Sequence, residues 1–475
     1  MTGTAYCCDV AIVGAGPAGM AAACVLVQSG RDVVVLDEQG APGGQAYRAI
    51  DRVFVDRPED VQTLGKHYAV GRTLTRRFQE SGARYRPGVS VWQITSDQEP
   101  ELALGLIDQG SAQMLYPKHI ILATGAMERP VPFEGWTLPG VMTVGAAQTL
   151  LKSSRLLPRE DVVLAGTGPL LYLYARQLKN LRVKPQAILD TGPSLSLRTG
   201  LLGLDALIAC PEAMLQGMRW LWSARTAMGM TRGVCALKAQ GEDRLRAVSY
   251  EAQRRRHELS TSLLLVHDGV IPNTWLSMSA GIKHHFDLVQ SCWVPDIHGA
   301  GMTSRQCISM VGDATRIGGA QVAALQGKRV GHEVDAYLKT QQRPAASVEP
   351  AALRCQRRLR SFLDHAFTPT AQFQLPEDDT IVCRCEEVTA GEIRQVAANG
   401  CMGPNQAKAF TRCGMGPCMG RKCALVVSQI MAQVGGISVE EIGHYRIRPP
   451  IRPITVGQLA DMPPRQDTVE PVEMA

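Results

Sequence analysis

Short apolar runs and one longer helical segment alternate over the first forty residues of the chain. Asp9–Val13 and Asp32–Leu36 are apolar runs of strand length, and Met20–Ser29 between them has the pattern of a helix. The turn before the helix reads Gly14-Ala-Gly-Pro-Ala-Gly19. A strand, a glycine-rich turn, a helix and a second strand form the βαβ unit that opens a dinucleotide-binding fold. This segment therefore predicts a nucleotide-binding domain.

The three glycines of this turn have separate physical roles. Gly14 permits the tight turn, Gly16 lets the backbone approach a pyrophosphate, and Gly19 lets the helix pack close to the strand. The free N–H groups at the helix start then face the phosphates. Asp37 lies 23 residues after Gly14, near the spacing of about 20 expected for an acid that binds ribose hydroxyls, and Glu38 is the neighbouring alternative.

A second unit of the same kind begins at Asp161–Ala165, an apolar run. Leu170–Leu181 follows as a helix, and Gln186–Leu189 is the next strand. The turn between them, Gly166-Thr-Gly168, lacks the third glycine because Leu171 occupies that position. A leucine there forces the helix away from the strand or fills the space that a cofactor needs. The pattern predicts a second nucleotide-type domain, and it favours a domain without NAD(P)H over one that binds it.

Two further strand ends join the halves of the chain. His119–Gly125 ends in Ala-Thr-Gly, and Ser309–Asp313 ends in Gly-Asp and precedes a helix opened by Ile317–Gly327. Together with the N-terminal unit, they predict one nucleotide domain interrupted by another. The expected fold is therefore α/β, with two dinucleotide-binding, Rossmann-like domains.

Composition and charge exclude several classes of protein. The chain has 475 residues, 45% of them hydrophobic and 20% charged, which excludes a mostly disordered chain and predicts roughly two to four domains. The net charge of +6 is mild and no long basic run exists, so nucleic acid is not an expected partner. No transmembrane helix is expected, because even the richest apolar stretch, Leu201–Met230, contains Asp205, Pro211, Glu212 and Arg219.

Cysteine is unevenly distributed along the chain. The N-terminus, Met1–Asp9, predicts no secretory signal, so a cytoplasmic protein is expected, with its 14 cysteines as thiols, metal ligands or small buried groups. Eight cysteines are scattered from Cys7 to Cys355, and six fall between Cys383 and Cys423. This crowding predicts a separate C-terminal module.

Two close cysteine pairs lie in this module. Cys383 and Cys385 are separated by one residue, Cys418 and Cys423 by four, and a helix is expected over Ala390–Asn399. Each pair can chelate one metal centre from a single loop, and four thiolates suit a 2Fe–2S cluster. Zinc is the alternative, although its four thiolates usually come from CxxC knuckles.

Four short motifs resemble the flavoproteins that have two dinucleotide-binding domains. They are Gly14–Gly19, Pro42-Gly-Gly-Gln45, Ala123-Thr-Gly125 and Gly312-Asp313. In that family the first domain holds FAD, and the resemblance implies these FAD-binding residues: Gly14, Gly16, Gly19, Asp37 with Glu38 beside it, Gly44, Gln45, Gly125 and Asp313. Asp313 is expected at the ribityl chain, and Gly44 and Gln45 along the isoalloxazine ring.

The chain departs from the disulfide reductases of that family, which carry a redox-active cysteine pair. Gly44 is followed by Gln-Ala-Tyr-Arg48, without a cysteine. In the second domain Cys210, Cys235 and Cys292 are far apart. A dithiol mechanism is therefore not expected.

The cysteine-rich segment resembles the bacterioferritin-associated-ferredoxin-like domain, a small helical module that binds a 2Fe–2S cluster. The resemblance implies the four cysteines of the two pairs as ligands: Cys383, Cys385, Cys418 and Cys423. Cys401 and Cys413 lie outside the pairs and are interpreted as packing residues.

The order of these parts resembles, over nearly the whole chain, the large α-type subunit of hetero-oligomeric flavin and iron–sulfur amine dehydrogenases. That family includes subunits of opine oxidase, hydrogen cyanide synthase and D-hydroxyproline dehydrogenase. The resemblance implies an electron-transfer subunit of an enzyme that oxidises the C–N bond of an amino acid or opine. A β subunit of the D-amino-acid-oxidase type is expected to hold the substrate, some members have a small ferredoxin-like γ subunit, and an FMN at a subunit interface is left open.

Electrons are expected to leave the flavin and the 2Fe–2S cluster for a quinone or a cytochrome rather than for oxygen. No residue of this chain is expected to act as a catalytic acid or base, and any attachment to the inner membrane is expected through partners. One alternative is an NAD(P)H-dependent flavoprotein reductase with an attached 2Fe–2S centre, which Leu171 argues against. Another is a scaffold that binds only an adenine nucleotide.

The domain order follows from these motifs. We expect an FAD-binding domain over residues 1–155 and 276–340, interrupted by the second nucleotide-type domain over 156–275. A linker over 341–379, with a helix at Ala351–Phe367, leads to the 2Fe–2S domain over 380–435. A proline-rich arm over 436–475 is expected to lie on another domain or on a partner chain.

Overall fold

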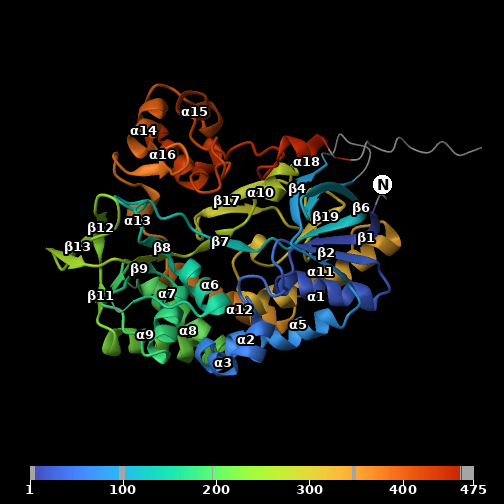
Figure 1. The fold of residues 1–475 in the computed structure, drawn as a ribbon, viewed down its shortest axis with the longest axis horizontal. Coiled ribbons are helices and arrows are strands. Elements are labelled where there is room, and N and C mark those ends of the chain that lie inside the picture. Colours follow the sequence, from blue (N-terminus) through green and yellow to red (C-terminus); the bar gives the residue numbers. More distant parts are fainter. Residues whose placement is uncertain are drawn as a thin grey trace, which may run out of the picture.

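Two sheets of mostly parallel strands, each covered by helices, make up the body of the protein, and a small helical module lies above them in Figure 1. The computed structural model describes residues 6–95, 102–159, 161–194, 196–344, 349–460 and 462. The first sheet is at the right of Figure 1, and the second sheet is at the left, below the C-terminal module. The predicted α/β fold with two dinucleotide-binding domains is confirmed.

The first sheet is built around β1, whose residues Val10, Ala11 and Ile12 are fully buried, as is typical of a central parallel strand. β2 and β6 flank β1 in parallel, and β19 pairs in parallel with β6. The strands in sheet order are β3 (Arg84–Pro87), β2 (Val33–Asp37), β1 (Tyr6–Val13), β6 (Ser111–Leu122), β5 (Leu104–Asp108) and β4 (Ser90–Ile94), with β19 (Ile308–Met310) beside β6.

Helices at both ends of this domain pack against each other on the sheet. α1 (Pro17–Gln28) follows β1, and α11 (Ala320–Thr340) lies along α1 with Val330 and Val334 fully buried. A short 3-10 helix, η1 (Gly312–Ala314), connects β19 to the turn before α11. Between β2 and β3 the chain forms a group of short helices: α2 (Ile50–Asp56), α3 (Pro58–Leu64), α4 (Lys66–Ala69) and α5 (Gly71–Gln79).

The second sheet repeats the arrangement, and its strands β9 and β15 are buried along their whole length. In sheet order the strands are β11 (Met230–Arg232), β10 (Ala187–Asp190), β9 (Val163–Thr167), β15 (Leu264–Asp268) and β8 (Val141–Thr143). Its helices are α6 (Val144–Ser154), α7 (Pro169–Asn180), α8 (Leu197–Ala209) and α9 (Pro211–Ala227). An antiparallel sheet of β12 (Cys235–Gln240), β13 (Ala247–Ala252) and β14 (Arg255–Ser260) extends this domain.

The chain crosses between the domains twice, and the two crossings pair with each other. β7 (Ala126–Glu128) leaves the first domain and β16 (Val270–Pro272) returns to it, antiparallel to β7. The returning chain forms α10 (Trp275–Ser279) and the hairpin of β17 (His284–Asp287) and β18 (Cys292–Pro295). Because β8 already pairs with β15, the chain joins the second sheet before residue 155, where the sequence pattern predicted the boundary.

The elements predicted from the hydrophobic pattern are confirmed, with small shifts at their ends. The helix predicted to begin at Met20 is α1, which begins at Pro17 because proline is favoured at the first position of a helix. The helix predicted to begin at Leu170 is α7, which begins at Pro169 for the same reason.

The linker after α11 is packed against the second domain. α12 (Ala351–Ala366) lies along α8, and α13 (Ala371–Gln374) buries Phe373, whose ring centroid is 5.8 Å from that of Phe133. Cys355 of α12 forms a disulfide with Cys210 at the α8–α9 junction. The expectation that cysteines outside the C-terminal module are thiols is wrong for this pair, because the packing of α12 brings together residues that are 145 positions apart.

The C-terminal module has its own core. Its elements are β20 (Ile381–Cys383), β21 (Val388–Thr389), α14 (Ala390–Ala398), α15 (Pro404–Thr411), α16 (Ala424–Gly435) and α17 (Val439–Ile442). α14 begins with a capping box in which Thr389 and Glu392 satisfy each other's backbone N–H groups. Ile442 and Tyr445 are buried in the same core, so the module continues past residue 435.

The chain after Tyr445 runs back over the first domain. The N–H of Ile451 donates to the carbonyl of Trp92 on β4 at 3.0 Å, and α18 (Val456–Ala460) follows. The last part of the predicted arm, residues 463–475, lies outside the described residues. No described helix combines the length and the apolar character that spanning a bilayer requires.

Candidate functional site

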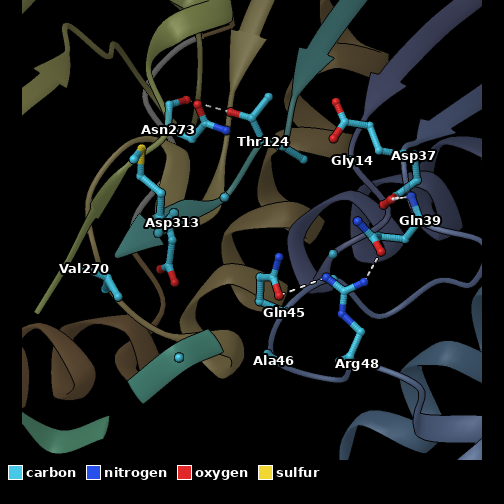
Figure 2. A pocket seen from close by; sticks show the side chains of 18 of the residues that line it. Gly14, Asp37, Gln39, Gln45, Ala46, Arg48, Thr124, Val270, Asn273 and Asp313 are labelled. Atoms are coloured by element: carbon cyan, nitrogen blue, oxygen red, sulfur yellow. Dashed lines mark hydrogen bonds between the residues drawn. The ribbon is translucent and has the colours of Figure 1, made fainter. Parts of the chain in front are cut away.

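A cavity of about 870 Å³ opens at the carboxyl ends of the strands of the first sheet. Crevices at this edge are where open α/β sheets bind ligands. Figure 2 shows Asp37 and Asp313 on opposite sides of the cavity, with Gln45 and Arg48 below them. The cavity is lined by all but one of the residues predicted to bind a cofactor: Gly14, Gly16, Asp37, Glu38, Gly44, Gln45, Gly125 and Asp313.

The remaining predicted residue, Gly19, acts through packing. A Cβ on Gly19 would lie 2.0 Å from the carbonyl oxygen of Gly14, so α1 approaches β1 only because residue 19 is glycine. Gly16 is different, because a Cβ there would meet no atom within 4 Å. The backbone at the start of α1 is therefore open to the cavity, where its N–H groups can receive a phosphate.

The two acids at the end of β2 have different surroundings. Asp37 is mostly buried, and its carboxylate accepts the N–H of Ala15 at 2.6 Å and of Gln39 at 2.7 Å. Burial raises the pKa of Asp37, although these two hydrogen bonds oppose the shift. Glu38 is exposed and forms an ion pair with Arg452 of the C-terminal arm. The geometry therefore favours Asp37 over Glu38 as the ribose ligand.

The opposite side of the cavity is held by the start of α11 and by the turn after β6. Asp313 accepts the N–H groups of Gly318 and Gly319 through Oδ1, at 2.8 and 2.9 Å, and Oδ2 has no partner among the described residues. Thr124 donates its hydroxyl to the carbonyl of Asn273 at 2.9 Å, which fixes the Ala-Thr-Gly turn (Figure 2). One carboxylate oxygen of Asp313 is thus free to bind a ligand hydroxyl.

Two basic residues that sequence reasoning missed fix the segment around Gln45. Arg48 donates to the side-chain oxygens of Gln39 and Gln45, as Figure 2 shows. Lys152 of α6 is buried and donates to the carbonyls of Gln45 and Ala46, both at 3.1 Å. Burial lowers the pKa of Lys152 to about 7. The only sequence signal for Lys152 was a lysine on an otherwise apolar helix face.

The corresponding edge of the second sheet is filled by protein. The ring of His267 lies against Gly168, where a Cβ would be 3.1 Å from the ring, and its Nδ1 is 2.9 Å from Glu128 Oε1. Burial would raise the pKa of Glu128, but hydrogen bonds, first that of His267, lower it. Leu171 is fully buried in the core.

The linker completes this filling. Thr370 donates its N–H and its hydroxyl to the carboxylate of Asp268, at 3.1 and 2.9 Å, and its hydroxyl is 2.8 Å from that of Thr191. Asp268 and Thr191 lie at the carboxyl ends of β15 and β10, where a nucleotide would bind in an intact domain. The linker therefore occupies the ligand edge of the second domain.

Five thiols gather in the C-terminal module. The Sγ atoms of Cys383, Cys413 and Cys423 lie within 4.8 Å of one another and are buried. Cys385 interacts with the thiol and the backbone of Cys418. Sequence reasoning set Cys413 aside as a packing residue, and the structure brings it beside two of the predicted ligands. Cys401 lies outside this group and packs against the module core.

The buried thiols are surrounded by hydrogen-bond donors. Cys413 and Cys423 lower the pKa of Cys383 to about 2, and the N–H of Gly414 donates to its sulfur at 3.5 Å. Tyr445 donates to the carbonyl of Cys413 at 3.1 Å. Hydrogen bonds to cysteine sulfur stabilise thiolates, and they tune the potentials of iron–sulfur clusters.

The thiol group and the nucleotide cavity share a wall. Trp275 lines the cavity, and its Nε1 donates to the carbonyl of Met419, which lies between Cys418 and Cys423, at 3.1 Å. Arg421 also lines the cavity and donates to the carbonyls of Cys418 and Ile451, at 3.1 and 3.3 Å. The same short loop therefore faces both sites.

Comparisons with known families agree with these two sites. Residues 8–327 match the pyridine nucleotide-disulphide oxidoreductase family, and residues 377–462 match the sarcosine oxidase A3 domain. Among solved structures, the L-proline dehydrogenase from P. horikoshii has a TM-score of 0.68 at 19% identity, over 96% of this chain and 79% of that chain. The thioredoxin reductase of T. acidophilum has a TM-score of 0.52 at 18% identity, over 70% of this chain and 100% of that chain. These similarities show the fold.

Similar sequences extend over nearly the whole chain. The larger-chain relative in opine oxidase of Rhizobium meliloti, its A-type subunit, is 39% identical, over 96% of this chain and 88% of the relative. The HcnB subunit of hydrogen cyanide synthase from Pseudomonas aeruginosa is 32% identical, over 93% of this chain and 96% of the relative. The chain therefore belongs to the family of oxidoreductase subunits that includes HcnB and the A-type subunit of opine oxidase, with the fold of the pyridine nucleotide-disulphide oxidoreductases and a C-terminal domain of the sarcosine oxidase A3 type.

Proposed function

We propose that this chain is the electron-transfer subunit of an amine or amino-acid dehydrogenase complex, with FAD in the cavity of the first domain and a 2Fe–2S cluster in the C-terminal module. The observation that carries the proposal is the shared wall, in which Trp275 and Arg421 contact the cysteine loop and also line the cavity. A protein that only bound a nucleotide would not need a group of thiols beside it.

The cavity fits FAD in three respects. The open backbone at Gly16 accepts a pyrophosphate, Asp37 accepts ribose hydroxyls, and Oδ2 of Asp313 is free for a ribityl hydroxyl. We also propose that Gly44, Gln45 and Gly125, which line the same cavity, lie along the flavin.

The thiol group fits a 2Fe–2S cluster by the chemistry of its donors, because such clusters are held by cysteine thiolates. We propose Cys383, Cys385, Cys418 and Cys423 as the ligands. Cys413 is the competing fifth thiol, since its sulfur lies near those of Cys383 and Cys423.

FAD would supply two-electron acceptance and the cluster one-electron transfer. The residues of the chain then have three tasks. Trp275 connects the cavity to the backbone of the cysteine loop, Arg421 holds that loop against the arm, and the hydrogen-bond donors around Cys383 stabilise its thiolate.

The relatives suggest what lies outside this chain. We propose that a partner β subunit of the D-amino-acid-oxidase type oxidises the C–N bond of an opine, a glycine-type or a D-hydroxyproline-type substrate. An interfacial FMN and a γ subunit belong to the same proposal. Electrons then leave for a quinone or a cytochrome, and the chain works in the cytoplasm.

Cofactor analysis and anaerobic stopped-flow spectroscopy test the proposal. The purified chain is expected to hold FAD and about two irons per chain, with acid-labile sulfide. Photoreduction of the flavin is expected to produce the EPR signal of a reduced cluster, and NADH and NADPH are expected to leave the flavin oxidised because Thr370 and His267 fill the second domain. One zinc without sulfide would contradict the cluster, and rapid bleaching by NADH would instead indicate a reductase.

A further inference from the structure

The outward face of α8 is apolar. Leu197, Leu201, Leu204 and Ile208 follow one another at helical spacing, and their exposed fractions are between 60% and 84%. The inward face carries smaller side chains, with Thr199 and Ala206 buried. An ordinary surface helix shows the reverse pattern, with polar residues outward.

α9 continues this apolar surface. Leu215, Met218 and Trp222 are spaced on one face of the helix, and Trp222 is 69% exposed. Figure 1 shows α8 and α9 together at the lower edge of the molecule, on the side opposite α14–α16. The outward side chains of α8 and α9 form what we call the α8–α9 face: Leu197, Leu201, Leu204, Ile208, Leu215, Met218 and Trp222. A contiguous exposed apolar patch of this kind marks a binding surface.

The charges beside the α8–α9 face are mainly positive. α8, α9 and α12 together carry seven arginines and three acidic residues. Arg198, Arg219 and Arg225 have no ion-pair partner among the described residues, and Arg357 and Arg358 of α12 are largely exposed. Leucine, isoleucine and tryptophan bordered by arginine are typical of helices that lie in the interface of a membrane.

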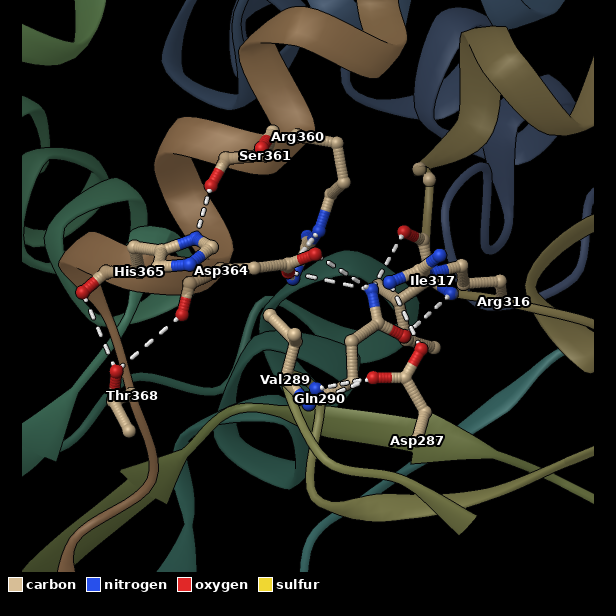
Figure 3. A network of polar contacts seen from close by, with 12 residues as sticks. Asp287, Val289, Gln290, Arg316, Ile317, Arg360, Ser361, Asp364, His365 and Thr368 are labelled. Atoms are coloured by element: carbon tan, nitrogen blue, oxygen red, sulfur yellow. Dashed lines mark hydrogen bonds and ion pairs between the residues drawn. The ribbon is translucent and has the colours of Figure 1, made fainter. Parts of the chain in front are cut away.

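The face is attached firmly to the rest of the molecule through α12. Figure 3 shows Asp364 of α12 between Arg360 and Gln290, with Gln290 Nε2 3.1 Å from Asp364 Oδ2. Gln290 also accepts the N–H of Ile317 at 3.3 Å, near the turn that Asp313 holds. At its other end, Cys355 is joined to Cys210 between α8 and α9. A force or a contact on the α8–α9 face is therefore borne by the whole subunit.

We propose that the α8–α9 face binds the surface of a lipid bilayer that contains anionic headgroups, with its apolar side chains in the interface and its arginines at the headgroups. Positive charge complements an anionic surface. A second copy of the chain fits less well, because a two-fold contact would place the same arginines against one another. The inference does not depend on which cofactors the protein holds.

Sedimentation of the full-length protein with lipid vesicles tests the inference. Wild-type protein is expected to bind vesicles of phosphatidylglycerol and phosphatidylethanolamine, and to bind phosphatidylcholine vesicles weakly. The double variant Leu201→Glu/Ile208→Glu is expected to lose at least about tenfold in the partition coefficient, because two carboxylates replace apolar contacts in the interface. Met402→Glu is the matched control, since Met402 of the C-terminal module is 79% exposed, as is Ile208.

Both substituted side chains point outward, so the flavin content and melting temperature of the double variant are expected to match those of wild type. Equal binding of both vesicle types, or equal binding by the double variant and wild type, would overturn the inference. Light scattering adds a second readout: a wild-type oligomer that the double variant converts to monomers would assign the face to a second copy of the chain instead.

Discussion

Gly416 lies in the loop that carries Cys418, and its replacement by alanine tests whether this loop positions the metal ligands. A Cβ on Gly416 would be 2.3 Å from the Cβ of Cys385, whereas ordinary contacts begin at 3.4 Å. The backbone of Gly416 is outside the left-handed region, so the added methyl acts through this contact alone. The loop and Cys385 must therefore move apart by about 1 Å.

A displacement of this size exceeds what a metal site accepts, because ligand distances are held to within about 0.2 Å. Gly416→Ala is expected to lower the iron content from about two per chain to less than about one. Overpacking is also expected to cost about 1–3 kcal/mol in the free energy of unfolding.

Iron and sulfide analysis, with EPR of the dithionite-reduced protein, measures the effect. Gly435→Ala is the matched control, since the nearest atom to its Cβ would be 3.5 Å away and alanine is favoured at the end of α16. A Gly416→Ala protein with the iron content and EPR signal of wild type would refute the reasoning, because it would show that Cys385 and the Cys418 loop need not meet at one centre.

Three further predictions concern single side chains. Cys418→Ser is expected to abolish the EPR signal of the reduced cluster, and Cys401→Ser and Cys413→Ser to keep it; loss of the signal in Cys413→Ser with survival in Cys423→Ser would assign Cys413 as the fourth ligand. Asp37→Ala is expected to weaken nucleotide binding about 10- to 100-fold in calorimetry, because charge-assisted hydrogen bonds are lost; Glu38→Gln, which affects only an exposed ion pair, should change the affinity little, and the reverse result would exchange the roles of the two acids. Burial lowers the pKa of His119 to about 3, so the unfolded chain takes up this proton first and stability falls as the pH drops from about 6.5 toward 3. His119→Leu is expected to flatten this slope in urea unfolding by about 1.4 kcal/mol per pH unit, and an unchanged slope would show that another group titrates.

The parts of the protein that the sequence could predict are those written within a few dozen residues. The turn from Gly14 to Gly19 and the acid at Asp37 form one local unit, and all of their predicted positions line the cavity or pack beneath it. The cysteine pairs are recognisable for the same reason, since each pair is formed by a single loop.

The residues that were missed owe their position to contacts between distant segments. Arg452 reaches Glu38 and Thr370 reaches Asp268 only after the linker and the arm have folded back over the body of the protein. Cys413 lies beside Cys383 because Gly414 and Tyr445 shape the loop around it. Spacing along the chain contains no record of such contacts, and it could not indicate the disulfide between Cys210 and Cys355 either.

The wall formed by Arg421, Ile451 and Arg452 determines when the cofactor can enter. These residues leave the ribosome last, whereas Gly14 and Asp37 leave it first, and N-terminal segments generally fold first during synthesis. A growing chain therefore has the phosphate-binding turn in place while the cavity is still open along one side. A nucleotide can enter at that stage, and docking of Arg452 on Glu38 then closes the exit, so that cofactor capture is tied to completion of the polypeptide.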